Sequence, residues 1–234
     1  MRPHCERKMD LEQSNQSYWI PLADLMTGLM MVFMLLTAAF MLRVEQTTTL
    51  VVKEYEITKR DLQLALQKEF AKDLKQWNAE ILGDMTIRFN DPSVLFATGS
   101  SELRPRFRAV LSEFFPRYIA LLTSEKFRVA VKEIRIEGHT SAFWSGAGNE
   151  KQAYFRNMEL SQARTRSTLE FLMALPKVQG EEKWLIQHVT ANGLSSSRPL
   201  SNKSSQAANQ RVEFRIVTNA SEKMDLIAEK LSSK

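Results

Sequence analysis

The sequence contains a single cysteine, Cys5, which excludes an intrachain disulfide and a zinc site built on cysteines. Eight glycines and seven prolines in 234 residues are too few for a collagen-like or low-complexity chain. The three histidines are far apart in the sequence, and His139, in a turn after an expected strand, is typical of a structural hydrogen-bonding residue. Motifs of zinc proteases, serine hydrolases, phosphate-binding loops and dinucleotide-binding folds are absent. We therefore expect no catalytic residue, no metal site and no cofactor.

The chain is basic, with 32 lysines and arginines against 27 aspartates and glutamates and an isoelectric point near 9.3. The basic residues are spread along the sequence, and no nucleic-acid-binding motif accompanies them, so we expect no direct contact with nucleic acid. A basic surface suits an acidic polymer or a membrane face equally well.

One long apolar run, from Ile20 to Leu42, contains a single charged residue. About 20 apolar residues are enough to cross a bilayer. The aromatic pair Tyr18 and Trp19 precedes the run and suits the headgroup layer. We predict a polar cytoplasmic tail over residues 1–17 and a single transmembrane helix over residues 18–42.

A cleavable signal peptide is the competing interpretation of this segment. Leu25–Leu36 has the length of a signal peptide's apolar region, and Thr37-Ala38-Ala39 resembles a cleavage site of small residues. The long leader and the carboxylate inside the apolar run argue against cleavage. We therefore predict an uncleaved anchor.

Residues 43–82 follow with an amphipathic pattern and form a predicted helical stalk that ends at Gly83-Asp84. Apolar residues recur every 11 positions, a spacing that keeps one stripe on a straight α-helix, at Val44, Tyr55, Leu66 and Trp77. Two interpretations weigh equally. The stripe packs against a partner helix in a dimeric stalk, or it rests on the protein's own domain.

Residues 83–234 alternate between strand and helix patterns, which indicates a compact α/β (α+β) sandwich of about 150 residues. Alternation predicts strands at Met85–Phe89, Val131–Gly138, Trp184–Ala191 and Val212–Val217, with a further short apolar run at Val94–Phe96. Apolar spacings of three and four predict helices at Leu103–Leu122, with Pro116 as a candidate interruption, at Met158–Leu175, with Asn157 as its cap, and at Ser221–Leu231.

The charged residue in the apolar run is Asp24. A carboxylate near the bilayer core costs at least ~2.5–3.5 kcal/mol on insertion scales, so such groups usually face a partner or a water path. One elementary charge crossing 100 mV yields ~2.3 kcal/mol, enough to bias a conformational cycle. Pro21 is expected in the first helical turn, while Thr27 and Gly28 allow close approach of another helix. The alternative is that Asp24 reaches the interface or stabilises the helix N-terminus.

The segment WIPLADLM, Trp19–Met26, resembles the membrane signature of MotB-type subunits, the B components of ion-driven stator motors. The resemblance implies that Asp24 accepts the transported ion. A lone carboxylate favours H⁺ over Na⁺ as that ion. The resemblance also implies a B-subunit homodimer inside a ring of MotA-like A subunits, five A to two B. The implied location is the bacterial inner membrane, with a periplasmic C-terminal domain.

A second resemblance covers roughly Gly83–Thr218, which is similar to OmpA-like peptidoglycan-binding domains. The motifs that carry it are IRIEGHT at Ile134–Thr140, NMELSQAR at Asn157–Arg164 and NQRVEF at Asn209–Phe214. The middle one matches the family pattern N-x-x-L-S-x-x-R at every defined position. Residues 83–234 are thus expected to form a peptidoglycan-binding domain.

The resemblance implies that Arg164 grips a free carboxylate of a peptidoglycan stem peptide, which a guanidinium does through two parallel hydrogen bonds. Asn157 is implied as a polar orienting residue beside it. Leu160 is either a groove residue or a core residue. Arg211 is either a second basic contact or one half of a structural pair, and both remain open.

One position departs from the family pattern. An aspartate commonly follows the Gly-x-Thr turn and faces the amine end of the peptide, but this sequence has Ser141 there. A serine cannot neutralise an ammonium group, so recognition of diaminopimelate is expected to be weaker or differently built. The loop over residues 142–156, which contains Phe143, Trp144, Glu150 and Tyr154, is the candidate to compensate. The alternative is that its aromatic residues simply pack the loop.

The Met-rich stretch DLMTGLMMVF, Asp24–Phe33, resembles the B subunit of Zorya anti-phage defence systems more closely than that of flagellar stators. Flagellar stators carry a longer linker with a plug, whereas here the expected stalk leads directly into the domain. The resemblance implies a wall-anchored, proton-driven motor subunit that transmits envelope perturbation by phage to cytosolic effectors. A flagellar MotB stator subunit and a passive envelope tether are the alternatives.

Overall fold

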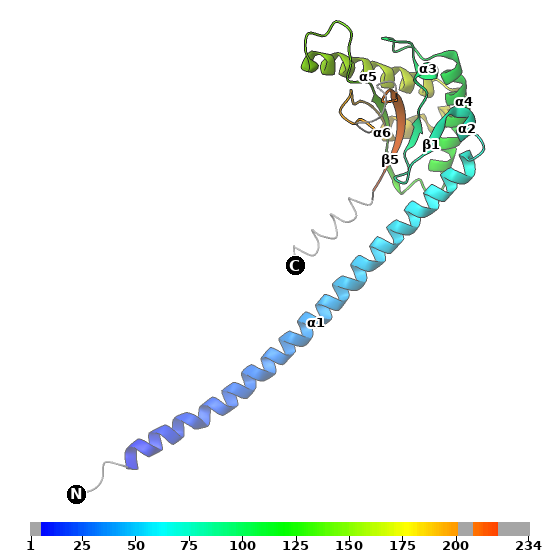
Figure 1. Ribbon diagram of the computed structural model, residues 1–234. Coiled ribbons are helices and arrows are strands. Elements are labelled where there is room, and N and C mark those ends of the chain that lie inside the picture. The colour runs from blue at the N-terminus through cyan, green and yellow to red at the C-terminus, as the bar shows by residue number, and fades with distance from the viewer. Residues whose placement is uncertain (1–5, 201–207, 220–234) are drawn as a thin grey trace. The chain divides into compact units, whose positions relative to one another are not determined.

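The computed structural model describes residues 6–200 and 208–219, with the backbone alone at residues 6–18 and 46–56. The chain forms two compact units, one up to Glu54 and one from Tyr55. Helix α1 (Glu6–Phe70) contributes to both (Figure 1). The helix expected at Ser221–Leu231 lies outside the described residues.

In the first unit, Trp19–Glu45 of α1 is long and apolar enough to cross a membrane, judged by length and composition. Its large apolar side chains are exposed along the stretch. The expected apolar helix is therefore present. Pro21 was expected in a first helical turn, which is wrong, because α1 already begins at Glu6 and Pro21 lies inside it. The residues after Glu6 are mostly good helix formers, so the helix extends past the apolar run towards the N-terminus.

In the second unit, the end of α1 packs on the protein's own domain. Leu62, Leu66 and Phe70 are fully buried there. This part of the apolar stripe follows the own-domain interpretation, whereas the side chain of Tyr55 lies outside the described residues.

The stalk helix, predicted to reach Gly83, ends earlier, at Phe70. A short helix α2 (Leu74–Trp77) follows, and Asn78 ends it in the left-handed conformation, at φ 50°. Strand β1 (Ala79–Ile81) begins directly afterwards. An 11-residue repeat is compatible with this break because Trp77 still reaches the same core from α2.

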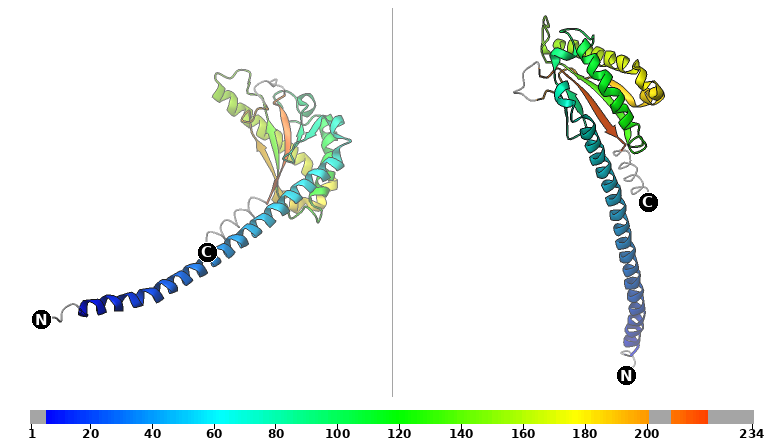
Figure 2. Two further views of the ribbon diagram at one scale, coloured as in Figure 1. Left: turned by 60° about the horizontal axis from the view of Figure 1, so that its bottom comes forward. Right: turned by 90° about the vertical axis from the view of Figure 1, so that its right-hand side faces the viewer.

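A five-stranded sheet forms the centre of the domain, in the order β1-β2-β5-β3-β4. Only β3 and β4 run parallel, and the other neighbours are antiparallel. The remaining strands are β2 (Ile87–Phe89), β3 (Val131–His139), β4 (Val189–Gly193) and β5 (Arg211–Thr218). Figure 2 shows the sheet with its helices from two further directions. The predicted α/β class is confirmed.

Two predicted elements differ in kind or extent. The apolar run at Val94–Phe96 is mostly helix α3 (Pro92–Leu95), because Asp91 caps it through the Ser93 amide. The strand predicted from Trp184 begins only at Val189. Before it lie a 3₁₀ helix, η1 (Pro176–Glu181), and helix α6 (Glu182–His188), whose Trp184 and Leu185 are buried.

Helix α4 (Pro105–Leu122) continues through Pro116 without interruption. A proline inside a helix costs roughly 3 kcal/mol. Here the cost is offset because the aromatic residues around it, Phe114, Phe115 and Tyr118, are fully buried. The ring of Phe114 lies 5.1 Å from that of Phe214 on β5, which fixes α4 to one face of the sheet.

Helix α5 (Glu150–Met173) begins eight residues before the predicted start at Met158. Asn149 is its cap, since its side chain accepts a hydrogen bond from the Gln152 amide at 2.9 Å. The prediction of Asn157 as the cap is wrong. Asn157 lies inside the helix and is buried.

Two glycines let α5 approach the ends of the parallel strands. A Cβ at Gly138 on β3 would lie 2.6 Å from the Thr165 methyl group, and a Cβ at Gly193 on β4 would overlap the backbone of Gln162. The helix therefore lies directly against the sheet. This contact sets where the side chains of α5 stand relative to the strand ends.

Candidate functional site

Helix α5 presents Asn157, Leu160 and Arg164 on one face, because residues three and four apart are neighbours on a helix. All three line one cavity of about 320 Å³. Three further segments contribute to the cavity walls. The described residues that line it are Thr98, Gly99, Thr140, Ser141, Phe143, Trp144, Ser145, Asn157, Leu160, Arg164 and Gln210.

Arg164 supplies the positive charge of the cavity. Its guanidinium is buried and donates hydrogen bonds from Nε to the Ser100 carbonyl at 2.9 Å and from Nη2 to the Ala97 carbonyl at 3.1 Å. Burial lowers the pKa of Arg164 to about 10, so the group remains a cation at neutral pH but is poorly solvated. A poorly solvated guanidinium favours an anionic partner.

Asn157 holds the loop that follows β3. Its side-chain amide donates to the Phe143 carbonyl at 3.2 Å, and the same carbonyl accepts a weak hydrogen bond from the Ser141 hydroxyl at 3.3 Å. The loop residues Ser141 and Phe143 are thus tied to α5. This contact fits the orienting role expected of Asn157.

Leu160 is half-buried in the cavity wall and stands apart from the hydrophobic core of the described residues. The groove interpretation therefore fits the geometry better than the core interpretation.

Arg211 lies outside this cavity. Its Nε donates to Glu213 at 2.6 Å, and its other nitrogens donate to the carbonyls of Asn209 and Arg198. The side chain is buried and fully engaged within the protein. Of the two interpretations left open by the sequence, the geometry favours the structural pair.

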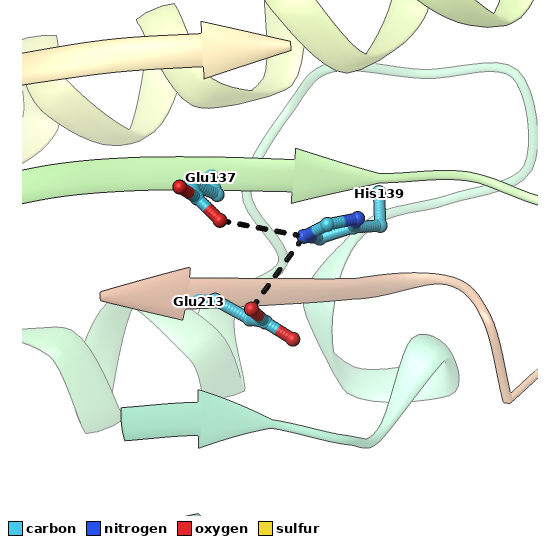
Figure 3. Close-up of side chains that lie close together, drawn as sticks. All are labelled: Glu137, His139 and Glu213. Atoms are coloured by element: carbon cyan, nitrogen blue, oxygen red, sulfur yellow. Dashed lines mark ion pairs between the residues drawn. The ribbon is translucent and has the colours of Figure 1, made fainter. Parts of the chain in front are cut away.

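His139 lies beside two carboxylates on the sheet face opposite to α5. Because side chains alternate along a strand, Glu137 and His139 point away from the face of Ile134 and Ile136. His139 Nε2 is 3.6 Å from Glu213 and 4.0 Å from Glu137, and all three side chains are buried (Figure 3). Burial lowers the pKa of His139, so the imidazole is neutral at pH 7.

The ligand atoms of these three residues lie within 4.8 Å of one another, as in a metal site. Arginines already neutralise the two carboxylates, however, since Arg88 lies 2.7 Å from Glu213 and Arg215 lies 3.2 Å from Glu137. A divalent ion would be repelled by these guanidinium groups. We therefore assign the cluster to a structural ion network.

The ion network changes how Glu213 titrates. Burial by itself raises the pKa of its carboxyl group, but the nearby His139 and Arg211 outweigh burial and hold that pKa well below its ordinary value. Glu213 therefore stays ionised on the sheet face opposite to α5. The network fixes β2, β3 and β5 to one another on the face away from the cavity.

Sequence reasoning missed several cavity residues. Thr140, Thr98 and Gln210 line the cavity but were not singled out. Gln210 lies within the NQRVEF motif and Thr140 within the IRIEGHT motif, whereas Thr98 lies two residues after the apolar run at Val94–Phe96. The motifs therefore marked the right segments, while the spacing of residues did not show which side chains reach the cavity.

Comparison with known proteins agrees with this description. A sequence profile of the OmpA family matches residues 95–213. The chain is similar to the Zorya protein ZorB of Escherichia coli, with 39% identity over 224 residues that cover 92% of this chain and 93% of the relative. A MotB-like protein from Desulfovibrio vulgaris has a similar solved structure, with a TM-score of 0.51 and 24% identity over 71% of this chain and 98% of that chain. The likeness to the solved structure concerns the fold.

Proposed function

Because the chain belongs to the OmpA family and to the family of the Zorya protein ZorB, we propose that it is the MotB-like B subunit of a proton-driven anti-phage motor. The observation that carries the proposal is the combination of two features in one chain. An apolar helix contains Asp24, and a separate OmpA-type domain contains a cavity with a buried cation. The ZorB relative matches over nearly its whole length, so both features fall within the likeness.

The cavity supports a role in cell-wall anchoring. Stem peptides of peptidoglycan carry free carboxylates, and the guanidinium of Arg164 is positioned by two backbone carbonyls to meet one. Asn157 would orient the loop on the opposite side, and Leu160 would contact the apolar part of the peptide. Arg211 supports the domain from outside the cavity.

The apolar helix supports a role in ion transfer. Asp24 is exposed along Trp19–Glu45, so in a bilayer its carboxylate needs a partner or a water path. A single helix cannot form such a path, and a multi-helix A subunit of the MotA type would supply it. Asp24 would then bind H⁺ on one side of the membrane and release it to the other. Thr27 and Gly28, on the next turn, are exposed and would allow the A subunit to approach closely.

The proposed assembly is a homodimer of this chain within a ring of A subunits, five A to two B. The N-terminus would lie in the cytoplasm and the OmpA-type domain in the periplasm, with the apolar helix in the inner membrane. Perturbation of the cell wall by a phage would then alter the activity of the motor. The A subunits would transmit this signal to cytosolic effectors. A passive tether would need none of these partners.

Replacement of Asp24 by Asn tests the motor. The change keeps the shape and hydrogen-bonding capacity of the side chain and abolishes titration, so protection against phage should be lost in cells that carry the complete system. The protein level in the membrane and its co-purification with the A subunit should stay unchanged. Thr37→Val, another polar position on the same helix, is the matched control and should keep protection.

If Asp24→Asn cells remain protected with normal assembly, the passive tether is the correct function. A flagellar role is tested in a motile host whose own stator B subunit is deleted, where restored swimming would favour a MotB function. The likeness to the MotB-like structure concerns the fold, whereas the likeness to ZorB covers both units of the chain. This difference favours defence.

A further inference from the structure

The cavity has an uneven charge composition. Among the described residues that line it, Arg164 is the one cation, and none is an aspartate or a glutamate. A ligand with one free carboxylate therefore meets an opposite charge, while an ammonium group on the same ligand meets none. The cavity is built for an anion next to a neutral group.

Two hydroxyl groups stand at the turn after β3. Thr140 is 3% exposed, and its Oγ1 has no hydrogen-bond partner among the described residues, although Thr140 lines the cavity. Ser141 has only a weak contact, to the Phe143 carbonyl at 3.3 Å. A buried hydroxyl without a partner costs roughly 1–3 kcal/mol, so a ligand that bonds to it gains a favourable contact. A hydroxyl accepts a hydrogen bond from a neutral amide N–H as well as from an amine.

Aromatic side chains complete the same wall. Phe143 is 69% exposed and Trp144 is half-buried beside it, and both line the cavity. Exposed aromatic rings of this kind bind the apolar face of a ligand. These rings offer a surface to an acyl group attached to the ligand nitrogen. An acidic residue in the same wall would instead favour a charged ammonium group on the ligand.

We propose that the cavity binds a stem-peptide diamino acid through its carboxylate equally well whether the side-chain amine is free or acylated. The amine is acylated in cross-linked peptidoglycan. The inference rests on the proposed wall-anchoring function. Arg164 binds the carboxylate, Thr140 accepts the amide N–H, and the aromatic wall contacts the acyl group. The domain would then hold mature, cross-linked wall without selecting for unreacted ends.

Purified sacculi test the proposal. One half of a preparation is acetylated with acetic anhydride, which converts free amines to neutral amides, and the other half is mock-treated. The full-length protein in detergent micelles is then sedimented with each, at physiological ionic strength to suppress non-specific attraction. We expect the wild-type protein to bind both with apparent affinities within about twofold, because no group in the cavity requires an ammonium.

Ser141→Asp should make binding depend on a free ammonium group of the ligand. A carboxylate at this position should favour mock-treated over acetylated sacculi by about tenfold, the scale of one partly buried ion pair. Ser141→Asn has nearly the same size without the charge and should bind both alike. Thr140→Val should weaken binding to both by about three- to tenfold, the scale of one hydrogen bond, without lowering the unfolding temperature.

The outcomes separate the inference from the function on which it rests. If the wild-type protein fails to sediment with either preparation, the anchoring function and the inference both fall. If it binds mock-treated sacculi and loses about tenfold or more on acetylation, anchoring stands and the inference is overturned. The wild-type comparison is decisive even if Ser141→Asp does not fold. If Thr140→Val binds as tightly as the wild type, the assignment of that hydroxyl to the ligand is overturned.

Discussion

The guanidinium carbon of Arg164 lies 4.9 Å from the centre of the Phe96 ring, so the cation of the cavity rests on an aromatic face. The carbonyls of Ala97 and Ser100 fix two of its nitrogens. The segment after α3 therefore clamps the cation in a single orientation. The proposed anchoring therefore depends on the Arg164 guanidinium, and the effect of its removal on binding can be measured directly.

Arg164→Ala should abolish sedimentation of the full-length protein with purified sacculi, because the cavity loses its cation. The same change frees two buried carbonyls and should cost about 1–3 kcal/mol of unfolding free energy. Binding and thermal unfolding should therefore be measured on the same preparation. Binding that persists in the folded variant would remove Arg164 from the site.

The matched control is Arg166→Ala, on the same helix. Arg166 is mostly exposed, and its one ion pair among the described residues is with Glu170, one turn along α5. An exposed pair of this kind contributes at most about 1 kcal/mol. The control should sediment like the wild type, which would show that loss of a positive charge on α5 is insufficient by itself.

The sequence correctly predicted the strands and helices whose apolar residues recur with a regular spacing. Val212–Val217 alternates and became β5, and the spacing of three and four in Leu103–Leu122 became α4. Trp184–Ala191 was harder because a short apolar run fits a helix or a strand equally. The tertiary structure decides between them, since strand pairing with β3 begins at Val189.

The helical half of the site was predictable for the same local reason. Asn157, Leu160 and Arg164 follow a helical spacing, so the motif placed them on one face before any tertiary contact was known. The opposite wall, with Thr98 and Gln210, is formed by segments far apart in the sequence. No local period connects such residues, which is why the sequence did not distinguish Thr98 and Gln210 as cavity residues.

Gly193→Ala should test how closely α5 must lie on the sheet. The new methyl group would overlap the backbone of Gln162, which cannot move without the whole helix. We expect a loss of about 1–3 kcal/mol of unfolding free energy, the usual cost of overpacking. Binding to sacculi should fall as well, because Arg164 is two residues further along the helix. Gly180→Ala has open space around it and should change neither property.

Phe70→Ala should show that the end of α1 is part of the domain. Phe70 is fully buried and its ring lies 5.3 Å from that of Phe114, so truncation should cost about 3–5 kcal/mol of unfolding free energy. Leu64, six residues earlier on α1, is 55% exposed, and Leu64→Ala should stay within about 0.5 kcal/mol. Equal effects of the two changes on thermal unfolding, followed by tryptophan fluorescence, would contradict the packing of this stripe.

Acid should unfold the domain in two stages. The pKa of buried His139 lies below its ordinary value of 6.5, so below that pH the unfolded chain binds more protons and stability falls. The pKa of Glu213 lies below its ordinary value of 4.5, so the stability that it contributes is present above pH 4.5 and is lost as the pH falls further. The unfolding free energy of the wild type should therefore fall gradually below pH 6.5 and more steeply below pH 4.5.

Glu213→Gln should remove the second stage. The variant leaves Arg211 and Arg88 without their buried carboxylate, so it should lose about 3–5 kcal/mol at pH 7, and its stability should vary less with pH below 4.5. Glu170→Gln, an exposed carboxylate paired with Arg166, should reproduce the wild-type curve. If the unfolding free energy of Glu213→Gln falls as steeply below pH 4.5 as that of the wild type, other carboxylates cause the fall. The ion network around Glu213 would then not determine the stability of the domain in acid.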